Sequence, residues 1–232
     1  MNRDFFQSGI KLYRAKRYKN ALEEFLQVKK DPSEDVDLSY YLGLCYANLE
    51  QYEDALVYLE QVVTLHTDLL MIYQCRLLLS YIYTITRRFK LAEFELDELI
   101  KAGFESPQVY SILSYSLYAQ NNTDRSLEYL DKALEMEPEN PNLLNSKGYI
   151  NADKERDIEE ALAYCKKAVR IKNDHPAYLD SLGWAYYKTG RYEEARVYLK
   201  RAYSLASGNK TIAGHLKAVM DAEKKSSGEE AL

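Results

Sequence analysis

The chain has 232 residues, of which 47% are hydrophobic, enough for one large domain or for a row of small repeats. Five proline and nine glycine residues are too few for a loop-rich β protein, and the apolar residues recur at helical spacing. The net charge is −5 and no basic stripe is present, which argues against a nucleic-acid partner, and no apolar run is long enough to span a membrane.

Residues 2–209 divide into six segments that each predict two amphipathic helices joined by a short turn. A small residue recurs in the second helix of every segment, at Ala21, Ala55, Ala92, Ser126, Ala161 and Ala195. The intervals are 34, 37, 34, 35 and 34 residues, and loops tolerate the small insertions. The segments are residues 2–35, 36–69, 73–106, 107–140, 141–175 and 176–209.

The clearest of these helix pairs is the last. Pro176 suits the first turn of a helix, and Gly190 supplies the turn between the two helices. The residues that define the pattern are Leu182, Gly183, Tyr186, Ala195, Leu199 and Ala202. This pattern resembles the tetratricopeptide repeat (TPR) family, whose 34-residue unit is a helix pair. The family's opening Trp is absent, and Leu179 stands in its place.

The resemblance extends over all six segments. It implies an all-α, right-handed superhelical solenoid of six TPR-like helix pairs. The match is weakest at residues 107–140, where Ser114 and Ser126 replace the family's glycine and alanine. Residues 210–225 predict a capping helix with Ile212, Leu216 and Val219 on one face, followed by a disordered tail at 226–232. We therefore expect about thirteen helices and no sheet.

No residue pattern predicts catalysis. The sequence contains no phosphate-binding loop and no nucleophile elbow. Three cysteines at wide spacing predict neither a disulfide framework nor a zinc site, and the three histidines lie far apart in the sequence. We therefore expect a protein that is not an enzyme and that has no cofactor and no metal.

The feature that predicts function is a row of aromatic residues. The resemblance implies that the first helices of successive pairs line a concave groove. One side of each first helix packs on its partner helix, and the side next to it is expected to face the groove. The residues predicted to line this partner-binding groove are Phe6, Tyr13, Tyr40, Tyr41, Leu44, Tyr81, Tyr115, Tyr118, Asn145, Tyr149, Asp180, Trp184 and Tyr187. For a single tyrosine, packing against its neighbours is an equally good explanation. The complete row favours binding.

These observations predict a protein–protein interaction module or scaffold. Its groove is expected to bind a peptide or a helical segment of a partner. Some TPR domains clamp a C-terminal carboxylate with Lys, Asn and Arg, but the corresponding positions here lack those residues. Two alternatives stay open, namely a structural protein that self-associates into a homo-oligomer and a subunit of a larger complex. The N-terminal sequence has no signal-peptide apolar segment, so we expect a cytoplasmic location.

Overall fold

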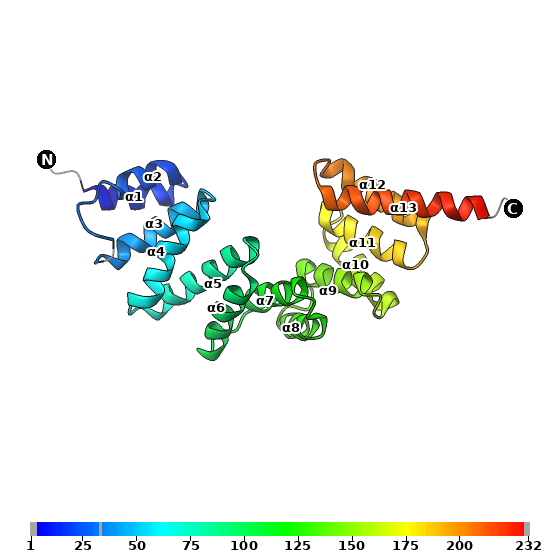
Figure 1. Cartoon of the computed structure of the whole chain (residues 1–232), viewed down its shortest axis with the longest axis horizontal. Helices are drawn as coiled ribbons and strands as arrows, with labels where there is room; N and C mark the ends of the chain where they lie inside the picture. The colour runs from blue at the N-terminus through cyan, green and yellow to red at the C-terminus, as the bar shows by residue number, and fades with distance from the viewer. Residues whose placement is uncertain (1–3, 33, 230–232) are drawn as a thin grey trace. The chain divides into compact units, whose positions relative to one another are not determined.

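The computed structural model describes residues 4–32 and 34–229, and only the backbone of residues 226–229. These residues form thirteen α-helices and no strand, which confirms the expected all-α fold of helix pairs with a final helix (Figure 1). The helices are α1 (Phe5–Arg14), α2 (Tyr18–Phe25), α3 (Val36–Asn48), α4 (Tyr52–Leu65), α5 (Leu69–Ile85), α6 (Phe89–Lys101), α7 (Pro107–Ala119), α8 (Thr123–Met136), α9 (Pro141–Asp153), α10 (Ile158–Ile171), α11 (Pro176–Lys188), α12 (Tyr192–Leu205) and α13 (Lys210–Glu229).

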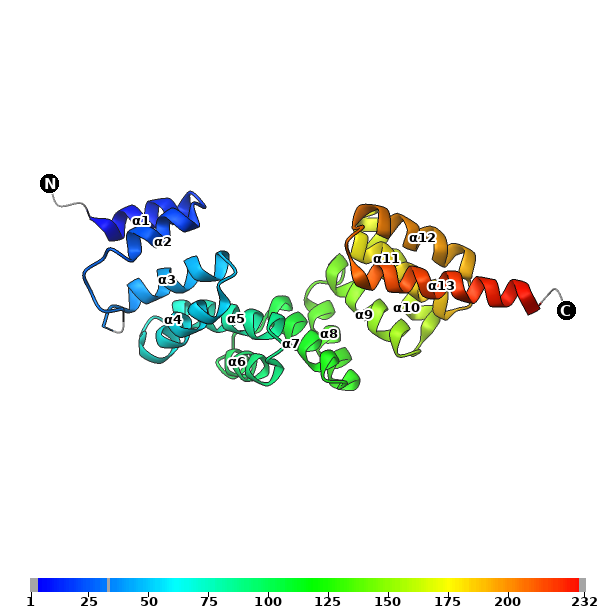
Figure 2. The ribbon, with the colours of Figure 1, turned by 45° about the horizontal axis from the view of Figure 1, so that its top comes forward.

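The chain forms two compact units that divide after Glu105. The N-terminal unit holds α1–α6 and the C-terminal unit holds α7–α13. Within each unit, the first helix of a pair packs on its own second helix, and each second helix packs on the first helix that follows it. Figures 1 and 2 show the two helices of each pair side by side. Each unit therefore buries its apolar faces between successive pairs, as the repeat pattern requires.

Most first helices begin at a side-chain cap. The side chains of Asp4, Asp35, Asp68, Ser106 and Asn140 each accept a backbone N–H from the first turn of their helix. The cap at Asp68 decides where the third pair starts, because it places the first turn of α5 at Leu69. The expected start at residue 73 therefore lies inside α5, and the three additional residues before it are helical.

The turn inside every pair uses a residue in the left-handed conformation. These residues are Lys16, Glu50, Arg87, Asn121, Glu155 and Gly190, and the fifth pair has a second one, Asp157, directly before α10. The residue that follows each of the six donates its N–H back over the turn, as from Arg17 to the Leu12 carbonyl oxygen at 2.9 Å and from Arg191 to the Tyr186 carbonyl oxygen at 3.0 Å. The turn that Gly190 predicts in the last pair thus recurs in the other five without glycine.

The small residues lie where two helices cross closely. All six residues that set the repeat intervals are completely buried. In the last pair, a Cβ atom built on Gly183 would lie 2.6 Å from Leu199 Cγ. In the fourth pair, Ser114 Oγ lies 2.9 Å from Ser126 Oγ, and Ser126 also donates to the Ser114 carbonyl oxygen at 2.8 Å. The pair that matches the family least well therefore replaces close apolar packing with buried hydrogen bonds.

Helix α13 covers the last pair. Ile212 and Val219 are buried, with Ile212 packed against Leu179 and Ala202. The helix continues to Glu229, beyond residue 225 where the sequence pattern ends it, and the remaining residues of the expected tail lie outside the described part of the chain. None of the described helices is long and apolar enough to span a bilayer. The cytoplasmic location stays a prediction.

Candidate functional site

The thirteen residues predicted to form the groove divide between the two units. The N-terminal unit contains Phe6 and Tyr13 on α1, Tyr40, Tyr41 and Leu44 on α3, and Tyr81 on α5. The C-terminal unit contains Tyr115 and Tyr118 on α7, Asn145 and Tyr149 on α9, and Asp180, Trp184 and Tyr187 on α11. All thirteen lie on first helices. Tyr81 and Tyr115 are exposed, Asp180 is buried, and the other ten are half-buried.

In the N-terminal unit, Tyr41 is the centre of an aromatic cluster. Its ring stacks on Phe25 at 5.3 Å between centroids and meets Phe6 and Tyr13 edge to face at 5.8 and 5.9 Å. Tyr40 is a further edge-to-face neighbour at 5.4 Å. These contacts hold the ring of Tyr41 in one position, since aromatic pairs in such geometries attract beyond their buried area.

Beside this cluster lies a hollow of about 410 Å³, which we call the aromatic hollow. It is lined by Tyr13, Arg14, Tyr40, Tyr41, Leu44 and Gln74. Four of its six residues belong to the predicted groove, while Phe6 and Tyr81 lie outside its lining. Three helices contribute to it, because Gln74 comes from α5.

A hydrogen bond closes one wall of the aromatic hollow. The Tyr40 hydroxyl donates to Gln74 Oε1 at 2.8 Å. Burial is the main cause that raises the pKa of Tyr40 to about 12, and burial also raises the pKa of Tyr13. Both hydroxyls therefore stay protonated at neutral pH. The hollow combines apolar ring surface with a few hydroxyl and amide groups, which is the usual composition of a protein's binding sites.

In the C-terminal unit, Trp184 lies under a histidine from the last helix. The His215 ring stacks on Trp184 at 4.1 Å with an interplanar angle of 19°, and Tyr187 stacks on Trp184 at 4.9 Å. His215 Nδ1 lies 2.9 Å from Asp180 Oδ1, and both side chains are largely buried. Together, Asp180, Trp184, Tyr187 and His215 form what we call the Trp184 cluster. Its own side chains cover both the Trp184 ring and the Asp180 carboxylate.

The predicted groove residues on α7 are more accessible than the Trp184 cluster. Tyr115 is 57% exposed, whereas the Tyr118 hydroxyl donates to Asp153 Oδ2 at 2.7 Å. Burial and this bond to a carboxylate raise the pKa of Tyr118, and burial raises the pKa of Tyr149 to about 12. Lys154 Nζ lies 5.2 Å from the Tyr118 ring centroid, within cation–π range. These contacts fix Tyr118 and leave Tyr115 as the accessible ring.

Two polar atoms of the predicted groove residues are buried without a hydrogen bond. Asn145 Oδ1 and Trp184 Nε1 have no hydrogen-bond partner among the described residues. Leaving a buried donor or acceptor unpaired costs about 1–3 kcal/mol, so both atoms lower stability, and neither is exposed to a segment that docks on the surface.

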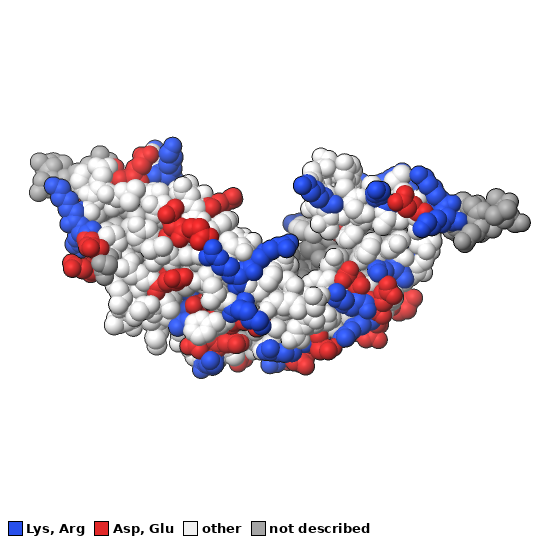
Figure 3. Space-filling view, viewed as in Figure 1, with Lys and Arg blue, Asp and Glu red and all other residues white. Residues whose placement is uncertain are grey.

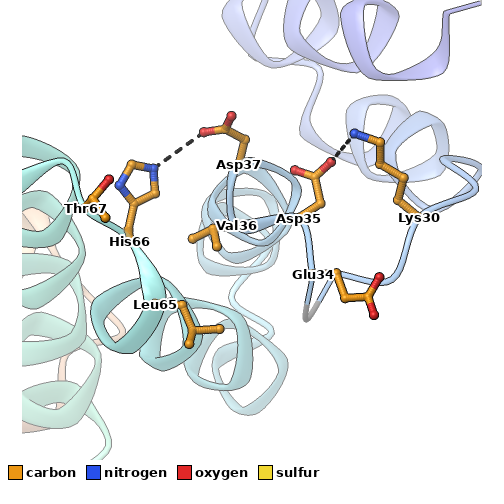
Figure 4. Close-up of a pocket in the computed structure, with 8 residues that line it drawn as sticks. All are labelled: Lys30, Glu34, Asp35, Val36, Asp37, Leu65, His66 and Thr67. Carbon is orange, nitrogen blue, oxygen red and sulfur yellow. Dashed lines mark hydrogen bonds and ion pairs between the residues drawn. The ribbon is translucent and has the colours of Figure 1, made fainter.

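A second hollow in the N-terminal unit is polar. It has a volume of about 380 Å³ and is lined by Lys30, Glu34, Asp35, Val36, Asp37, Leu65, His66 and Thr67. Figure 4 shows that its charged groups face each other, with Lys30 Nζ 2.7 Å from Asp35 Oδ2 and His66 Nε2 3.6 Å from Asp37 Oδ1. The hydrogen bond from Lys30 lowers the pKa of Asp35, whose carboxylate also caps α3. These pairs join the loop after α2 to α3 and α4, which is a structural role.

The described residues include no group of His, Cys, Asp and Glu arranged to hold a metal ion. Cys45, Cys75 and Cys165 are buried, and burial raises the pKa of each thiol to about 12. A thiol at such a pKa is a poor nucleophile at neutral pH.

Three contributors to these surfaces were missed by the sequence pattern, namely Arg14, Gln74 and His215. Gln74 lies 34 residues after its partner Tyr40, and His215 lies 35 residues after its partner Asp180. One repeat period therefore separates the members of each pair. Counting one repeat period forward from the groove residues Tyr40 and Asp180 would have found Gln74 and His215.

Comparison with known proteins shows which family the chain matches. A family model described as tetratricopeptide repeat matches residues 6–68 and 113–176, and a second model of the same description matches residues 176–209. The chain is similar to protein O-mannosyl-transferase TMTC1 of Homo sapiens, with 23% identity over 218 residues that make up 93% of this chain and 24% of that protein. It is also similar to mitochondrial import receptor subunit TOM70 of Homo sapiens, with 24% identity over 83% of this chain and 32% of that protein.

The chain thus spans about a quarter to a third of the length of these relatives. Among solved structures, it is similar to YrrB, described as a TPR protein with an unusual peptide-binding site. The TM-score is 0.58 at 18% identity, and the match covers 86% of this chain and 97% of that chain. A likeness at this identity shows the fold of helix pairs.

Proposed function

Because the chain belongs to the tetratricopeptide repeat family, we propose that it is a non-enzymatic interaction module that binds a peptide or helical segment of a partner protein. The observation that carries this proposal is the aromatic hollow between α1, α3 and α5. It presents the rings of Tyr13, Tyr40 and Tyr41 together with Leu44. Rings held by their neighbours give a partner a large apolar contact at low cost in side-chain entropy.

The lining of the hollow indicates what enters it. A leucine or aromatic side chain of the partner would contact Leu44 and the tyrosine rings. Arg14 is exposed and brings a positive charge to the lining, so an acidic residue next to the apolar anchor would be favourable. The unusual peptide-binding site described for YrrB supports peptide recognition on such a fold, and the proposal for this chain depends on its own hollow.

In the C-terminal unit, we propose that a partner segment also contacts Tyr115 and Tyr118. Tyr115 offers an exposed ring there. The Trp184 cluster contributes less, because His215 and Tyr187 already cover the indole. Most of the affinity is expected to come from apolar contact, so it should respond weakly to salt.

A peptide-binding assay tests the proposal. A panel of synthetic peptides with one leucine or aromatic anchor beside a glutamate is measured against the full chain, and the tightest binder is then measured against Leu44→Ala. We expect a loss of roughly 10-fold or more, since truncating an anchor contact of a binding hot spot costs on the order of 1–2 kcal/mol. The control is Val57→Ala on α4, because Val57 is exposed and lies outside the hollow.

Circular dichroism melts show whether Leu44→Ala stays folded. Equal affinities of Leu44→Ala and Val57→Ala would refute the aromatic hollow as the binding site. Light scattering of the pure chain addresses the alternative of a structural protein. A homo-oligomer that Leu44→Ala dissociates, in a chain that binds none of the peptides, would favour self-association.

A further inference from the structure

Helix α13 takes the position that a first helix has in the preceding pairs. It packs on α12, as every first helix inside a unit packs on the preceding second helix, and it also contacts α11. The contact between Asp180 and His215 spans 35 residues, the same spacing as between Tyr118 and Asp153. Within the described residues, no helix follows α13 to cover the side that a second helix would cover.

A hollow of about 460 Å³, which we call the α13 hollow, lies along α13 beside α12. Its lining is Tyr203 of α12 together with Ala213, Leu216, Lys217, Met220, Asp221 and Lys224 of α13. The α13 residues recur at three- and four-residue intervals, so they form one stripe of the helix. Met220 is 41% exposed and Tyr203 is 38% exposed, although both are large and apolar enough to pack in a core.

The charges around the α13 hollow are mostly positive. Lys217 and Lys224 line it and are exposed, against one lining carboxylate, Asp221. Nearby, Arg196 Nε lies 2.9 Å from Glu223 Oε1. Figure 3 shows Lys and Arg side chains over α12 and α13, with Asp or Glu side chains and uncharged surface between them. This local sign is opposite to the net charge of the chain, which is −5.

We propose that the α13 hollow is a docking surface for an acidic amphipathic helix of a partner protein, which packs along α13 beside Tyr203. The apolar face of that helix would contact Leu216, Met220 and Tyr203. Its glutamate or aspartate side chains would meet Lys217 and Lys224 at the edges. An amphipathic helix in an apolar groove with complementary charges at the rim is a common mode of recognition.

The charges also argue against a second copy of this chain as the occupant. The solvent side of the first pair is basic, since Lys11, Arg14, Lys16, Arg17 and Lys19 are all exposed. Docking the start of one copy on the α13 hollow of another would bring like charges together, and so would docking two α13 hollows face to face. Like-charge contacts across an interface are unfavourable, whereas an acidic helix gains attraction at the same positions.

Two synthetic peptides test this inference on the full chain. The first is an amphipathic helix of about 18 residues, five turns, with leucine on one face and glutamate at its edges. The second has the same sequence with lysine in place of every glutamate. Fluorescence anisotropy of the labelled peptides measures both affinities. We expect the acidic peptide to bind at least 10-fold more tightly than the basic one, with an affinity that falls as salt rises.

Variants then locate the site. Met220→Glu should weaken the acidic peptide at least 10-fold, because it places a like charge in the apolar part of the hollow. Lys217→Glu with Lys224→Glu should reverse the preference between the two peptides. Val57→Glu on the exposed side of α4 is the matched control for an added charge, and Leu44→Ala separates this surface from the aromatic hollow. Val57→Glu should leave the affinity unchanged, whereas Leu44→Ala removes only binding to the aromatic hollow.

Several results would overturn the proposal. These are equal binding of the acidic and basic peptides, no binding of either, and binding that Met220→Glu leaves unchanged in a folded chain. A concentration-dependent dimer in sedimentation that Met220→Glu abolishes would assign the surface to a second copy instead. Loss of binding through Leu44→Ala would assign the peptide to the aromatic hollow, so failure here is distinguishable from failure of the proposed function.

Discussion

Replacing Gly148 by alanine is expected to destabilise the C-terminal unit, although alanine is the better helix former. Gly148 lies in α9 where α10 crosses it. A Cβ atom at this position would lie 2.5 Å from Cys165 Sγ, 2.9 Å from the Ala161 carbonyl oxygen and 3.0 Å from the Cys165 backbone nitrogen. The last two atoms are backbone, so rotating a side chain cannot relieve the contact. The two helices have to move apart, which disturbs the packing of a dense interior.

The expected magnitude follows from two opposing effects. Overpacking a well-packed interior costs about 1–3 kcal/mol. Alanine in place of glycine in a helix gains up to about 1 kcal/mol. Because two of the close contacts are with backbone atoms, the cost lies in the upper part of its range, and the net loss for Gly148→Ala is about 1–2 kcal/mol. Gly214→Ala is the matched control, because a Cβ atom on Gly214 meets no described atom within 4 Å. That substitution should keep the helix-propensity gain and stabilise the chain by about 0.5–1 kcal/mol.

Urea unfolding followed by Trp184 fluorescence measures both variants, since Trp184 is the only tryptophan and lies in the same unit as Gly148 and Gly214. With a slope of about 1–3 kcal/mol per molar urea, the midpoint should fall by roughly 0.5–1 M for Gly148→Ala and rise for Gly214→Ala. Adding Cys165→Ala to Gly148→Ala removes the sulfur contact but keeps the carbonyl contact, so the rescue should be partial. A Gly148→Ala midpoint at or above that of the parent would refute the close crossing.

Two further predictions concern titration and the last helix. The pKa values of Tyr40 and Tyr149 are raised to about 12, so the unfolded chain, with tyrosine pKa near 10, releases these protons first. The stability that these two tyrosines contribute is complete below about pH 10 and is lost as the pH rises through about 12. Tyr40→Phe and Tyr149→Phe should therefore each make the loss of stability at alkaline pH less steep. Unfolding followed by tyrosinate absorbance measures this loss. His215→Ala should lower stability by about 1–3 kcal/mol and shift Trp184 emission to the red, because it uncovers the indole and leaves the Asp180 carboxylate unpaired. His66→Ala, whose partner carboxylate is exposed, should do neither.

The succession of helix pairs could be predicted because packing constrains it in every repeat. Two helices that cross closely require a small residue at the crossing, so Ala55 or Ala195 recurs at the repeat interval whatever the surface residues are. The same constraint explains how the fourth pair tolerates serine. Ser114 and Ser126 are still small, and their hydroxyls form hydrogen bonds at the crossing. The sequence predicts the size of these residues but not their hydrogen bonds.

The turns and the start of α5 were harder to predict. Left-handed backbone usually indicates glycine, but Glu50 and Arg87 adopt it here because the N–H after each donates to a carbonyl oxygen of the preceding helix. A helix pair fixed by its packing can therefore impose this conformation on almost any residue. Likewise, the cap at Asp68 extends α5 by one turn, and the repeat interval does not predict this local effect.

The predicted groove shows that a residue on the groove side of its helix is not necessarily accessible to a partner. The helical period alone predicts which residues lie on the groove side of each first helix. Whether a ring on that side is accessible depends on its neighbours in the next repeat. Trp184 and Tyr115 have the same register position, but His215 covers Trp184 while Tyr115 stays 57% exposed.

This difference changes which aromatic residues can bind a partner. The covered ring of Trp184 contributes mainly to the stability of its own unit, because it already stacks on His215 and Tyr187. The edges of the aromatic hollow and the exposed ring of Tyr115 are what a segment can reach. A partner's affinity should therefore depend more on Leu44 and Tyr115 than on the indole. Trp184 is better suited to report the folding of the C-terminal unit than to anchor a ligand.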